Sequence, residues 1–310
     1  MDTLRPRPEM DGAKPHNQPK RVLLAGASGT IGRAVADALE ASGHHVSNVA
    51  RDDFASSEQL AKAVAIAKPD TVVSCIASRS GSPKDAEAVD FLTNLNLLKS
   101  AEAAGAAHFI LLSAICVQRP RLAFQHAKIA FERALKASTI DHTIVRPTAF
   151  FKSLSGQVER VAKGKPFMIF GDGELTRCKP ISNRDLARFI VNCVTDPARR
   201  NQVLPIGGPG PAISLREQGE MIFEVAGKPA RFKSISPRLF TAAARLLSVA
   251  APFSSWFAEK AEYARIAHYY ATESMLVLNG ETGEYDAENT PEFGEDRLSD
   301  HYQRLIGALK

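Results

Sequence analysis

Three glycines near the start of the chain have the spacing of a phosphate-binding turn. Gly26, Gly29 and Gly32 form a G-x-x-G-x-x-G pattern between a short apolar run, 22–25, and a helical pattern over 31–41. A strand that turns into a helix leaves unpaired N–H groups and the positive end of the helix dipole at one point, which suits a pyrophosphate. We expect Gly26 to permit the turn, Gly29 to let a phosphate approach, and Gly32 to let helix and strand touch. Between a strand and a helix, this spacing predicts a dinucleotide site rather than an ordinary glycine-rich turn.

The end of the next strand selects between the two nicotinamide dinucleotides. A strand is predicted over 45–50, and Arg51 follows it, with Arg33 nearby in the glycine turn. An acidic residue at this place binds a ribose 2′-hydroxyl, whereas an arginine accommodates a 2′-phosphate. Arg51 therefore predicts NADPH, although Asp52 and Asp53 come directly afterwards and leave a contact to the ribose open.

Strands and helices alternate regularly up to about residue 150. Further buried strands are expected at 71–76, 108–113 and 143–147, with helices at 56–67, 91–104 and 120–137. Alternation of this kind predicts a parallel sheet with helices on both faces. The predicted fold class is α/β: a Rossmann-type doubly wound parallel sheet with a smaller, mostly helical C-terminal substrate lobe.

The same pattern divides the chain into parts. Residues 1–19 are polar and rich in proline, and we expect them to form a disordered tail. Residues 20–150 form the predicted NADP-binding domain, to which 178–206 are expected to return, and 151–310 form the predicted substrate lobe.

One helix of the lobe is expected to carry a large apolar face. It is predicted over 254–272, where Trp256, Tyr263 and Tyr270 recur at helical spacing. Aromatic residues in such a pattern belong more often to a core than to a pocket, so we expect these three to be buried.

Composition narrows the classes of function. The chain has 310 residues and a net charge of +5 without a long basic block, so no nucleic-acid contact is expected. The four cysteines form no C-x-x-C pair, and neither a metal site nor an iron–sulfur cluster is expected. The apolar runs are far shorter than the roughly 18 residues of a membrane span, and the N-terminus lacks a signal-peptide pattern. These features predict a cytoplasmic protein with no stable membrane anchor.

The chain resembles a known group of reductases. The glycine turn, Ser113 after a strand, and Lys128 on the following helix are similar to the atypical short-chain dehydrogenase/reductases of the NmrA and isoflavone-reductase kind. Longer stretches are similar to the divinyl chlorophyllide 8-vinyl reductase family: 73–79, 108–118, 144–154, 179–182, 201–210 and 269–278. The resemblance spans about 20–305. It implies NADPH-dependent reduction of the 8-vinyl group of a tetrapyrrole, divinyl chlorophyllide or its protochlorophyllide analogue, to ethyl in chlorophyll or bacteriochlorophyll synthesis. An apolar pigment leaves contact with a photosynthetic membrane surface open.

One segment departs from that family. Its members have a longer connection with an extra strand after the second strand, whereas 51–70 is compressed here. The contacts on the adenine side of the cofactor are therefore not predicted.

The resemblance also implies catalytic roles. The wider superfamily has a tyrosine four positions before the lysine, and here that position is Phe124, which shares a helix face with Lys128. Phenylalanine cannot donate a proton, which disfavours carbonyl reduction and suits hydride addition to a conjugated vinyl group. Lys128 is expected to bind the nicotinamide ribose and to assist electrostatically, and Ser113 to line the nicotinamide site. His126 is expected to be structural.

The remaining predicted contacts lie in loops that follow strands. Phe150 and Phe151 are expected to stack on the pigment, with a core role equally open, and Lys152 to meet its propionate; Phe124 is also expected to border the substrate. The full set predicted for the cofactor is Gly26, Ser28, Gly29, Thr30, Ile31, Gly32, Arg51, Ala77, Ser78, Arg79, Lys128, Pro147 and Thr148.

Two other functions fit the same residues. A non-catalytic NADP-binding sensor or assembly factor of the NmrA type is favoured by the missing tyrosine. A reductase of the same fold acting on another conjugated metabolite is the second.

Overall fold

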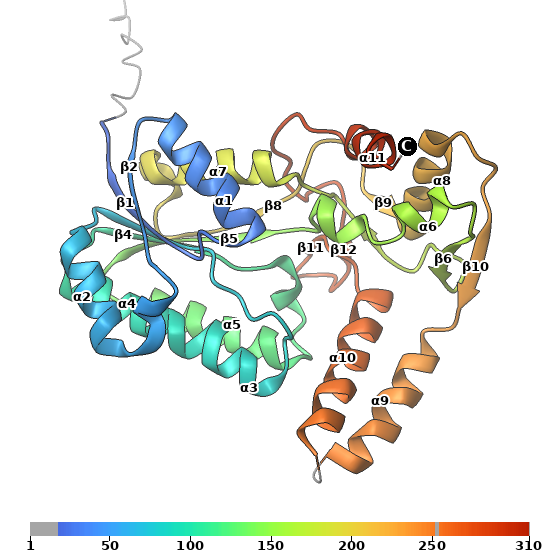
Figure 1. The fold of residues 1–310 in the computed structure, drawn as a ribbon, viewed down its shortest axis with the longest axis horizontal. Coiled ribbons are helices and arrows are strands. Elements are labelled where there is room, and N and C mark those ends of the chain that lie inside the picture. The colour runs from blue at the N-terminus through green and yellow to red at the C-terminus, as the bar shows by residue number, and fades with distance from the viewer. Residues whose placement is uncertain (1–17, 252–253, 310) are drawn as a thin grey trace, which may run out of the picture.

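The computed structural model describes residues 18–251 and 254–309, so most of the predicted N-terminal tail lies outside the described residues. Its main element is a six-stranded sheet in which every pair is parallel, in the order β2-β1-β3-β4-β5-β8 (Figure 1). The strands are β1 (Arg21–Ala25), β2 (His45–Asn48), β3 (Thr71–Ser74), β4 (His108–Leu112), β5 (Asp141–Pro147) and β8 (Gln202–Ile206). This order confirms the predicted doubly wound sheet. The direction of strand addition reverses between β1 and β3, where such sheets bind ligands.

Helices cover both faces of the sheet. One face carries α1 (Thr30–Ala41) and α7 (Asn183–Thr195); the other carries α2 (Ser57–Ala67), α4 (Asn94–Ala103) and α5 (Ala123–Lys136) (Figure 1). Side chains of a strand alternate between faces. Accordingly, Val22 and Leu24 of β1 belong to the core under α1 and α7, while Leu23 belongs to the core under α2 and α4.

The connection from β2 to β3 is short. It contains a 3₁₀ turn at Asp52–Ala55 and helix α2, and no strand. As a result, β2 is an edge strand of the sheet. The compression of 51–70 therefore removes the strand that the resemblance leads one to expect beyond β2.

A second unit is built mainly from the C-terminal half of the chain. Its core gathers buried side chains such as Phe167, Phe223 and Tyr302. The contributing elements are α6 (Val158–Ala162), β6 (Phe167–Phe170), α8 (Leu215–Ala226), β10 (Phe232–Ile235) and α11 (Leu298–Gly307). The parallel pair β6–β10 is an addition to the mostly helical lobe that the sequence predicts. Its two strands have four residues each, too short to show a reliable period.

Short elements join the two units. They are β7 (Arg177–Cys178), β9 (Ile213–Ser214), β11 (Val277–Leu278) and β12 (Tyr285–Asp286), whereas α3 (Pro83–Asp85) packs beside α5. Between them the chain returns to the sheet through α7 and β8, and β8 pairs with β5. The structure thus draws its six-stranded sheet from two separated stretches of sequence.

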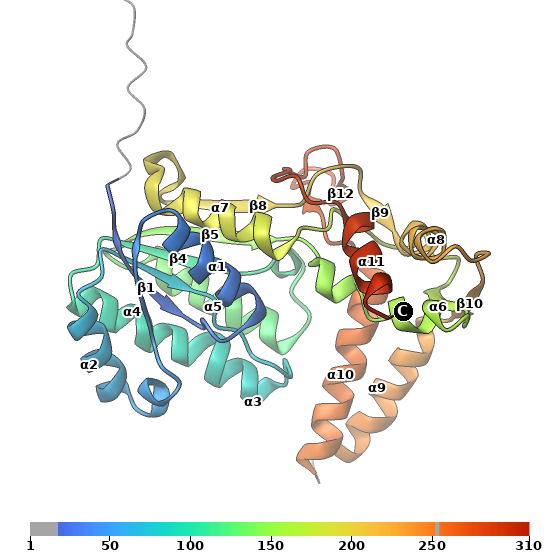
Figure 2. The same cartoon turned by 45° about the horizontal axis from the view of Figure 1, so that its top comes forward.

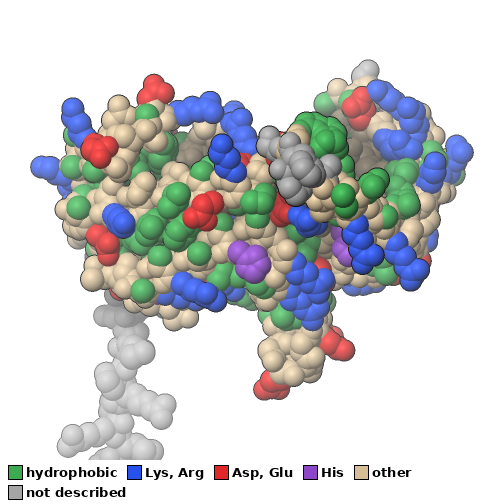
Figure 3. Space-filling view, turned by 90° about the horizontal axis from the view of Figure 1, so that it is seen from below, with side chains coloured by type: hydrophobic (Ala, Val, Ile, Leu, Met, Phe, Trp, Pro, Cys, Tyr) green, Lys and Arg blue, Asp and Glu red, His purple; other side chains and the backbone are tan. Residues whose placement is uncertain are grey.

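A helical hairpin projects from the body. It consists of α9 (Arg238–Ala250) and α10 (Ser255–Thr272), which pack on each other (Figures 1 and 2). The expectation that its aromatic side chains are buried is wrong: Trp256, Tyr263 and Tyr270 are 55%, 69% and 45% exposed. The reason is that α9 covers only one side of α10. The view from below shows exposed hydrophobic side chains among basic ones spread over both units (Figure 3). No described helix is long and apolar enough to cross a membrane.

Candidate active site

The glycine turn forms an open cradle at the start of α1. Gly26 has φ +87°, and a Cβ there would lie 2.9 Å from the backbone of Cys75. A Cβ on Gly32 would overlap the carbonyl oxygen of Gly26, so only glycine permits this close packing of helix on turn. Gly29 is the N-cap of α1, and no side chain caps the helix. Its first backbone N–H groups are therefore free for an anion.

Two cationic side chains flank this cradle. Ser28, Gly29 and Thr30 are exposed, and the first turn of α1 contains no acidic residue. Lys152 Nζ donates to Thr30 Oγ1 at 2.9 Å, and the guanidinium of Arg33 donates to the carbonyl of Ser28 at 3.0 and 3.1 Å. Positive charge beside a helix N-terminus fits a pyrophosphate. Lys152 thus contacts the phosphate cradle, the cofactor side of the border at which the sequence predicts it.

Asp53 and Arg51, which follow β2, have different environments. The carboxylate of Asp53 accepts a hydrogen bond from the backbone N–H of Ala50 at 2.7 Å, so it is engaged in the turn itself. Arg51 is exposed. This arrangement favours the 2′-phosphate interpretation of Arg51 over a ribose contact from Asp53.

Lys128 is held by a buried carboxylate that the sequence did not indicate. Its Nζ lies 2.9 Å from Asp90 Oδ1, and the two side chains are 11% and 0% exposed. The same oxygen accepts from the backbone N–H of Ser78 at 3.3 Å, which ties the pair to the loop after β3. The second oxygen of Asp90 has no partner among the described residues. Asp90 lies in a π-helical stretch, Ala86–Thr93, and such stretches are frequent at functional sites.

That loop after β3 contains the predicted cofactor contacts Ala77, Ser78 and Arg79. Ala77 and Arg79 are exposed. The loop is held in shape from outside, because the carboxylate of Asp85 accepts the backbone N–H groups of Arg79 and Ser80 at 3.0 and 2.9 Å. The exposed side chains of Ala77 and Arg79 lie at the carboxyl end of β3.

The hydroxyl of Ser113 donates its proton in a hydrogen bond to a buried carboxylate. Its Oγ donates to Glu132 Oε1 at 2.6 Å, and Glu132 is 2% exposed. Glu132 is also paired with the guanidinium of Arg146, whose Nε donates at 3.1 Å. Glu132 lies one helical turn after Lys128 on α5, so the two buried charged groups share a face. Ser113 can accept a hydrogen bond at the site, but its proton is not available to a substrate.

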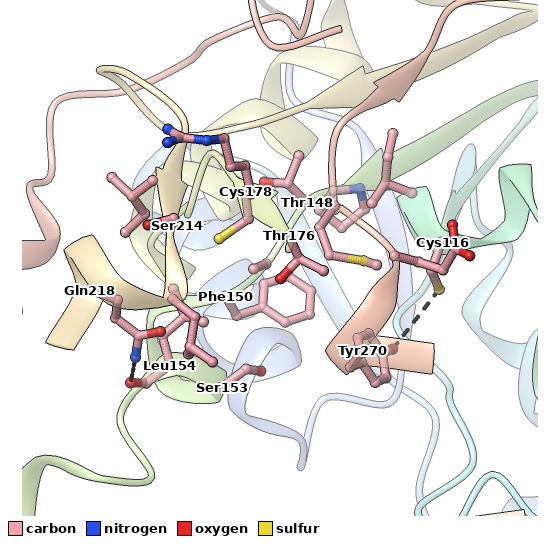
Figure 4. A pocket seen from close by; sticks show the side chains of 18 of the residues that line it. Cys116, Thr148, Phe150, Ser153, Leu154, Thr176, Cys178, Ser214, Gln218 and Tyr270 are labelled. Carbon is pink, nitrogen blue, oxygen red and sulfur yellow. Dashed lines mark hydrogen bonds between the residues drawn. The ribbon is translucent and has the colours of Figure 1, made fainter. Parts of the chain in front are cut away.

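A cavity of about 480 Å³ opens beside the ends of β4 and β5 (Figure 4). It is lined by segments from both units, and its lining is predominantly apolar. The lining residues from the sheet side are Ala114, Ile115, Cys116, Pro147, Thr148, Ala149 and Phe150. Those from the lobe and α10 include Leu154, Phe170, Arg177, Cys178, Gln218, Tyr270, Glu273 and Met275. The cavity is therefore shaped for a large, mostly apolar molecule next to the cofactor crevice.

The residues predicted to contact the substrate do not all line the cavity. Phe150 lines the cavity, whereas Phe151 is 4% exposed and packs in the core of the lobe near His301. Of the two roles left open for Phe151, the structure supports the core role, because Phe151 begins a 3₁₀ turn, Phe151–Leu154, that packs against the core of the lobe. Phe124 packs against a small cluster at the start of α5 that includes Leu122 and Ile266.

Burial favours the neutral form of two thiols and one phenol in the cavity wall. Burial raises the pKa of the Cys116 thiol, and it raises the pKa of Cys178 to about 12. Burial also raises the pKa of the Tyr270 hydroxyl well above its ordinary value near 10. Within 18–251 and 254–309, no cluster of three His, Cys, Asp or Glu side chains could hold a metal ion.

Fold and site together define an NAD(P)H-binding protein with a substrate cavity beside the cofactor crevice. Residues 48–197 match the family model described as NAD(P)H-binding. The chain is 41% identical to the chloroplastic divinyl chlorophyllide a 8-vinyl-reductase of Oryza sativa subsp. indica, covering 98% of this chain and 84% of that protein. It is 42% identical to the protein of the same name from Arabidopsis thaliana, covering 92% of this chain and 76% of that one. This chain belongs to the divinyl chlorophyllide a 8-vinyl-reductase family.

A solved structure supports the fold independently of that relation. The NADPH-dependent quinone oxidoreductase QOR2 of Escherichia coli, in complex with NADPH, superposes with a TM-score of 0.65 at 17% identity. The match covers 92% of this chain and 99% of the other. At this identity the likeness concerns the fold alone.

Proposed function

We propose that this protein uses NADPH to reduce the 8-vinyl group of divinyl chlorophyllide a, or of its protochlorophyllide analogue, to an ethyl group. The observation that carries the proposal is the apolar cavity of about 480 Å³ at the ends of β4 and β5, whose lining includes Pro147 and Thr148, two of the residues predicted to contact the cofactor. A flat macrocycle needs such a space, and family membership supplies the chemical identity of the pigment. A conjugated vinyl group can accept hydride because the resulting charge spreads into the ring.

NADPH supplies the hydride when it is bound. The cradle at Gly26, Gly29 and Gly32, together with Lys152 and Arg33, is suited to hold its pyrophosphate. Lys128, which is paired with Asp90, is proposed to bind the nicotinamide ribose. The protein contributes mainly position, and alignment of two reactants can supply on the order of 7–11 kcal/mol of the barrier.

The pigment is proposed to lie against Phe150 with its ring edge toward the ends of β4 and β5. Because Lys152 is engaged at the phosphate cradle, another cation is needed for a propionate. Arg177 is the basic residue among those lining the cavity, where it is paired with Glu174 and Glu217. Arg177 is therefore our candidate for the substrate carboxylate.

The direct test incubates the purified protein with divinyl chlorophyllide and NADPH. The expected result is a shift of the Soret band as the 8-vinyl group leaves the conjugated system, with oxidation of one NADPH per pigment. A protein that binds NADPH and leaves the pigment unchanged would instead be the sensor or assembly factor favoured by Phe124.

The relatives are named as chloroplastic, and we propose that this protein works in the cytoplasm or on the surface of a photosynthetic membrane, where its pigment partitions. Sedimentation with and without membranes distinguishes these two locations.

A further inference from the structure

Reduction of a vinyl group requires a proton as well as a hydride. The two residues at which the superfamily places hydroxyl chemistry cannot supply it here: position 124 is a phenylalanine, and the proton of Ser113 is donated to Glu132. We propose that Tyr270 is the general acid, which protonates the inner carbon of the vinyl group from the side of α10. This proposal rests on the proposed function.

Tyr270 lies on the wall of the cavity. It is located near the end of α10 and faces the same space as Ala114, Cys116 and Phe150. Its hydroxyl is 3.9 Å from the sulfur of Cys116, which follows β4 by only a few residues (Figure 4). The phenol therefore lies in the cavity wall beside the segment that follows β4, and its sulfur neighbour is three residues after Ser113.

The hydroxyl of Tyr270 has a weaker partner than those of three other tyrosines. Tyr269 donates to the carbonyl of Cys116 at 2.8 Å, Tyr285 to the carboxylate of Glu273 at 2.7 Å, and Tyr302 to the carbonyl of Leu154 at 3.1 Å. Among residues 18–251 and 254–309, the hydroxyl of Tyr270 has only the weak sulfur contact. A thioether or thiol sulfur is a poor acceptor, so the O–H of Tyr270 is free to turn toward a ligand.

Its protonation state suits the role. Burial raises the pKa of Tyr270 well above 10, so the phenol carries its proton throughout the neutral range. Its ring is 45% exposed, because it borders an open cavity, and the phenolate formed in a turnover can be reprotonated by water. A weak acid is adequate here, since the group to be protonated is a carbanion stabilised only by conjugation.

The step balances as follows. Hydride from NADPH bonds to the terminal vinyl carbon, which becomes the methyl group, and the electron pair of the double bond moves to the inner carbon and the ring. The phenol O–H breaks, its proton bonds to the inner carbon, and the ethyl group is complete. Water then returns a proton to the phenolate. The pigment gains two electrons and two hydrogens, and NADPH is oxidised to NADP⁺.

The test compares Tyr270→Phe with Tyr263→Phe, a matched change one heptad earlier on α10 at a side chain that is 69% exposed. We expect Tyr270→Phe to lower kcat by about 100-fold, the low end of the range for general acids. Tyr263→Phe should keep wild-type turnover. Binding of the pigment without NADPH, followed by the Soret band, should remain within twofold of wild type in both variants.

Buffer rescue separates proton donation from a structural role. The kcat of Tyr270→Phe should rise in proportion to the concentration of a small acid such as imidazolium, whereas wild-type kcat should not. A Tyr270→His variant should recover part of the rate below about pH 6.5 and lose it above, following the imidazole. This variant also serves if the phenylalanine variant folds poorly.

Two outcomes overturn the proposal. One is a Tyr270→Phe enzyme with kcat within twofold of wild type. The other is a slow variant whose pigment binding is equally weakened and whose rate ignores buffer acid. If the wild-type protein itself fails to reduce the pigment, the proposed function fails, and this is visible before any variant is made.

Discussion

The two halves of the site are built in opposite ways. The phosphate cradle comes from one short stretch, 26–33, whose shape is set by glycine contacts within the turn and with β3. The cavity draws its walls from segments that range from Ala114 to Met275 and belong to the sheet, the lobe and α10. The cradle is complete once a strand and a helix form, whereas the cavity exists only when both units are assembled. A single substitution in the glycine turn should therefore abolish NADPH binding. Substitutions at other residues should have smaller effects on binding or stability.

The largest effect is expected at the cradle. In Gly32→Ala the added Cβ overlaps the carbonyl of Gly26 and must push α1 away from the turn. We expect the Kd for NADPH, measured by nicotinamide fluorescence, to rise at least about 100-fold, with a stability loss of about 1–3 kcal/mol from overpacking. Gly156→Ala, where a Cβ meets nothing within 4 Å, is the matched control. Binding of NADPH by Gly32→Ala within twofold of wild type would show that the cradle is as tolerant as the cavity.

The second effect tests the buried ion pair between Lys128 and Asp90. Lys128→Ala leaves Asp90 buried without its counter-ion, and loss of one partner of a buried pair costs about 3–5 kcal/mol. Urea unfolding should show this loss, whereas Lys136→Ala, at an exposed position of the same helix, should stay within about 0.5 kcal/mol of wild type.

The double variant Asp90→Asn with Lys128→Met sharpens the result. It removes both charges, so stability should return most of the way while NADPH binding stays weak. Full NADPH affinity in the double variant would contradict the role given to Lys128.

The third prediction concerns the stability of the sheet, which depends on neither the cradle nor the cavity. His108 of β4 is fully buried against Thr143, and burial lowers its pKa to about 4. An unfolded histidine titrates near 6.5, so between these values the unfolded chain binds a proton that the folded chain does not. The free energy of unfolding is therefore unaffected by His108 above about pH 6.5. It falls by up to about 3 kcal/mol as the pH is lowered toward 4, because protonation then favours the unfolded chain.

Unfolding free energies at pH 4.5 and 7 check this. His108→Gln should show a smaller drop than wild type between the two pH values, while His126→Gln, at an exposed position of α5, should show the same drop as wild type. Equal drops in all three proteins would refute the assignment.

The smallest effect decides the place of Lys152. Its ammonium contacts Thr30 at the cradle, and a single exposed ionic contact contributes at most about 1 kcal/mol. Lys152→Ala should therefore weaken NADPH binding about fivefold and leave pigment binding unchanged, with exposed Lys165→Ala as control. The reverse pattern would restore the propionate role that the sequence suggests.

The sequence predicts the locally built cradle better than the cavity, whose walls come from distant segments. The glycine turn and the alternation of strands and helices are local patterns, so the fold class, the five strands before β8 and the glycine turn were predictable from 20–150. The compression of 51–70 also indicated that the sheet lacks a strand beyond β2. These features depend on neighbours in the chain.

The rest depends on contacts between distant residues. Tyr270 meets Cys116 across 154 positions, and no periodicity signals such a contact. Asp90 lies in a π-helical stretch, whose side chains leave the ordinary helical register, so its approach to Lys128 was hidden. Glu132, four residues after Lys128 on the same helix face, was within reach of a spacing argument. Phe151 begins a 3₁₀ turn rather than continuing a strand, so no alternation could have separated it from Phe150.

The position of β8 has a consequence for how the molecule is made. A growing chain completes β5 well before β8, because the first segments of the lobe are synthesised between them. Until residue 206 has left the ribosome, β5 has an open edge, and open edges are where chains pair wrongly. The nucleotide-binding half therefore matures late in translation, and chains truncated at about residue 150 should collect in inclusion bodies.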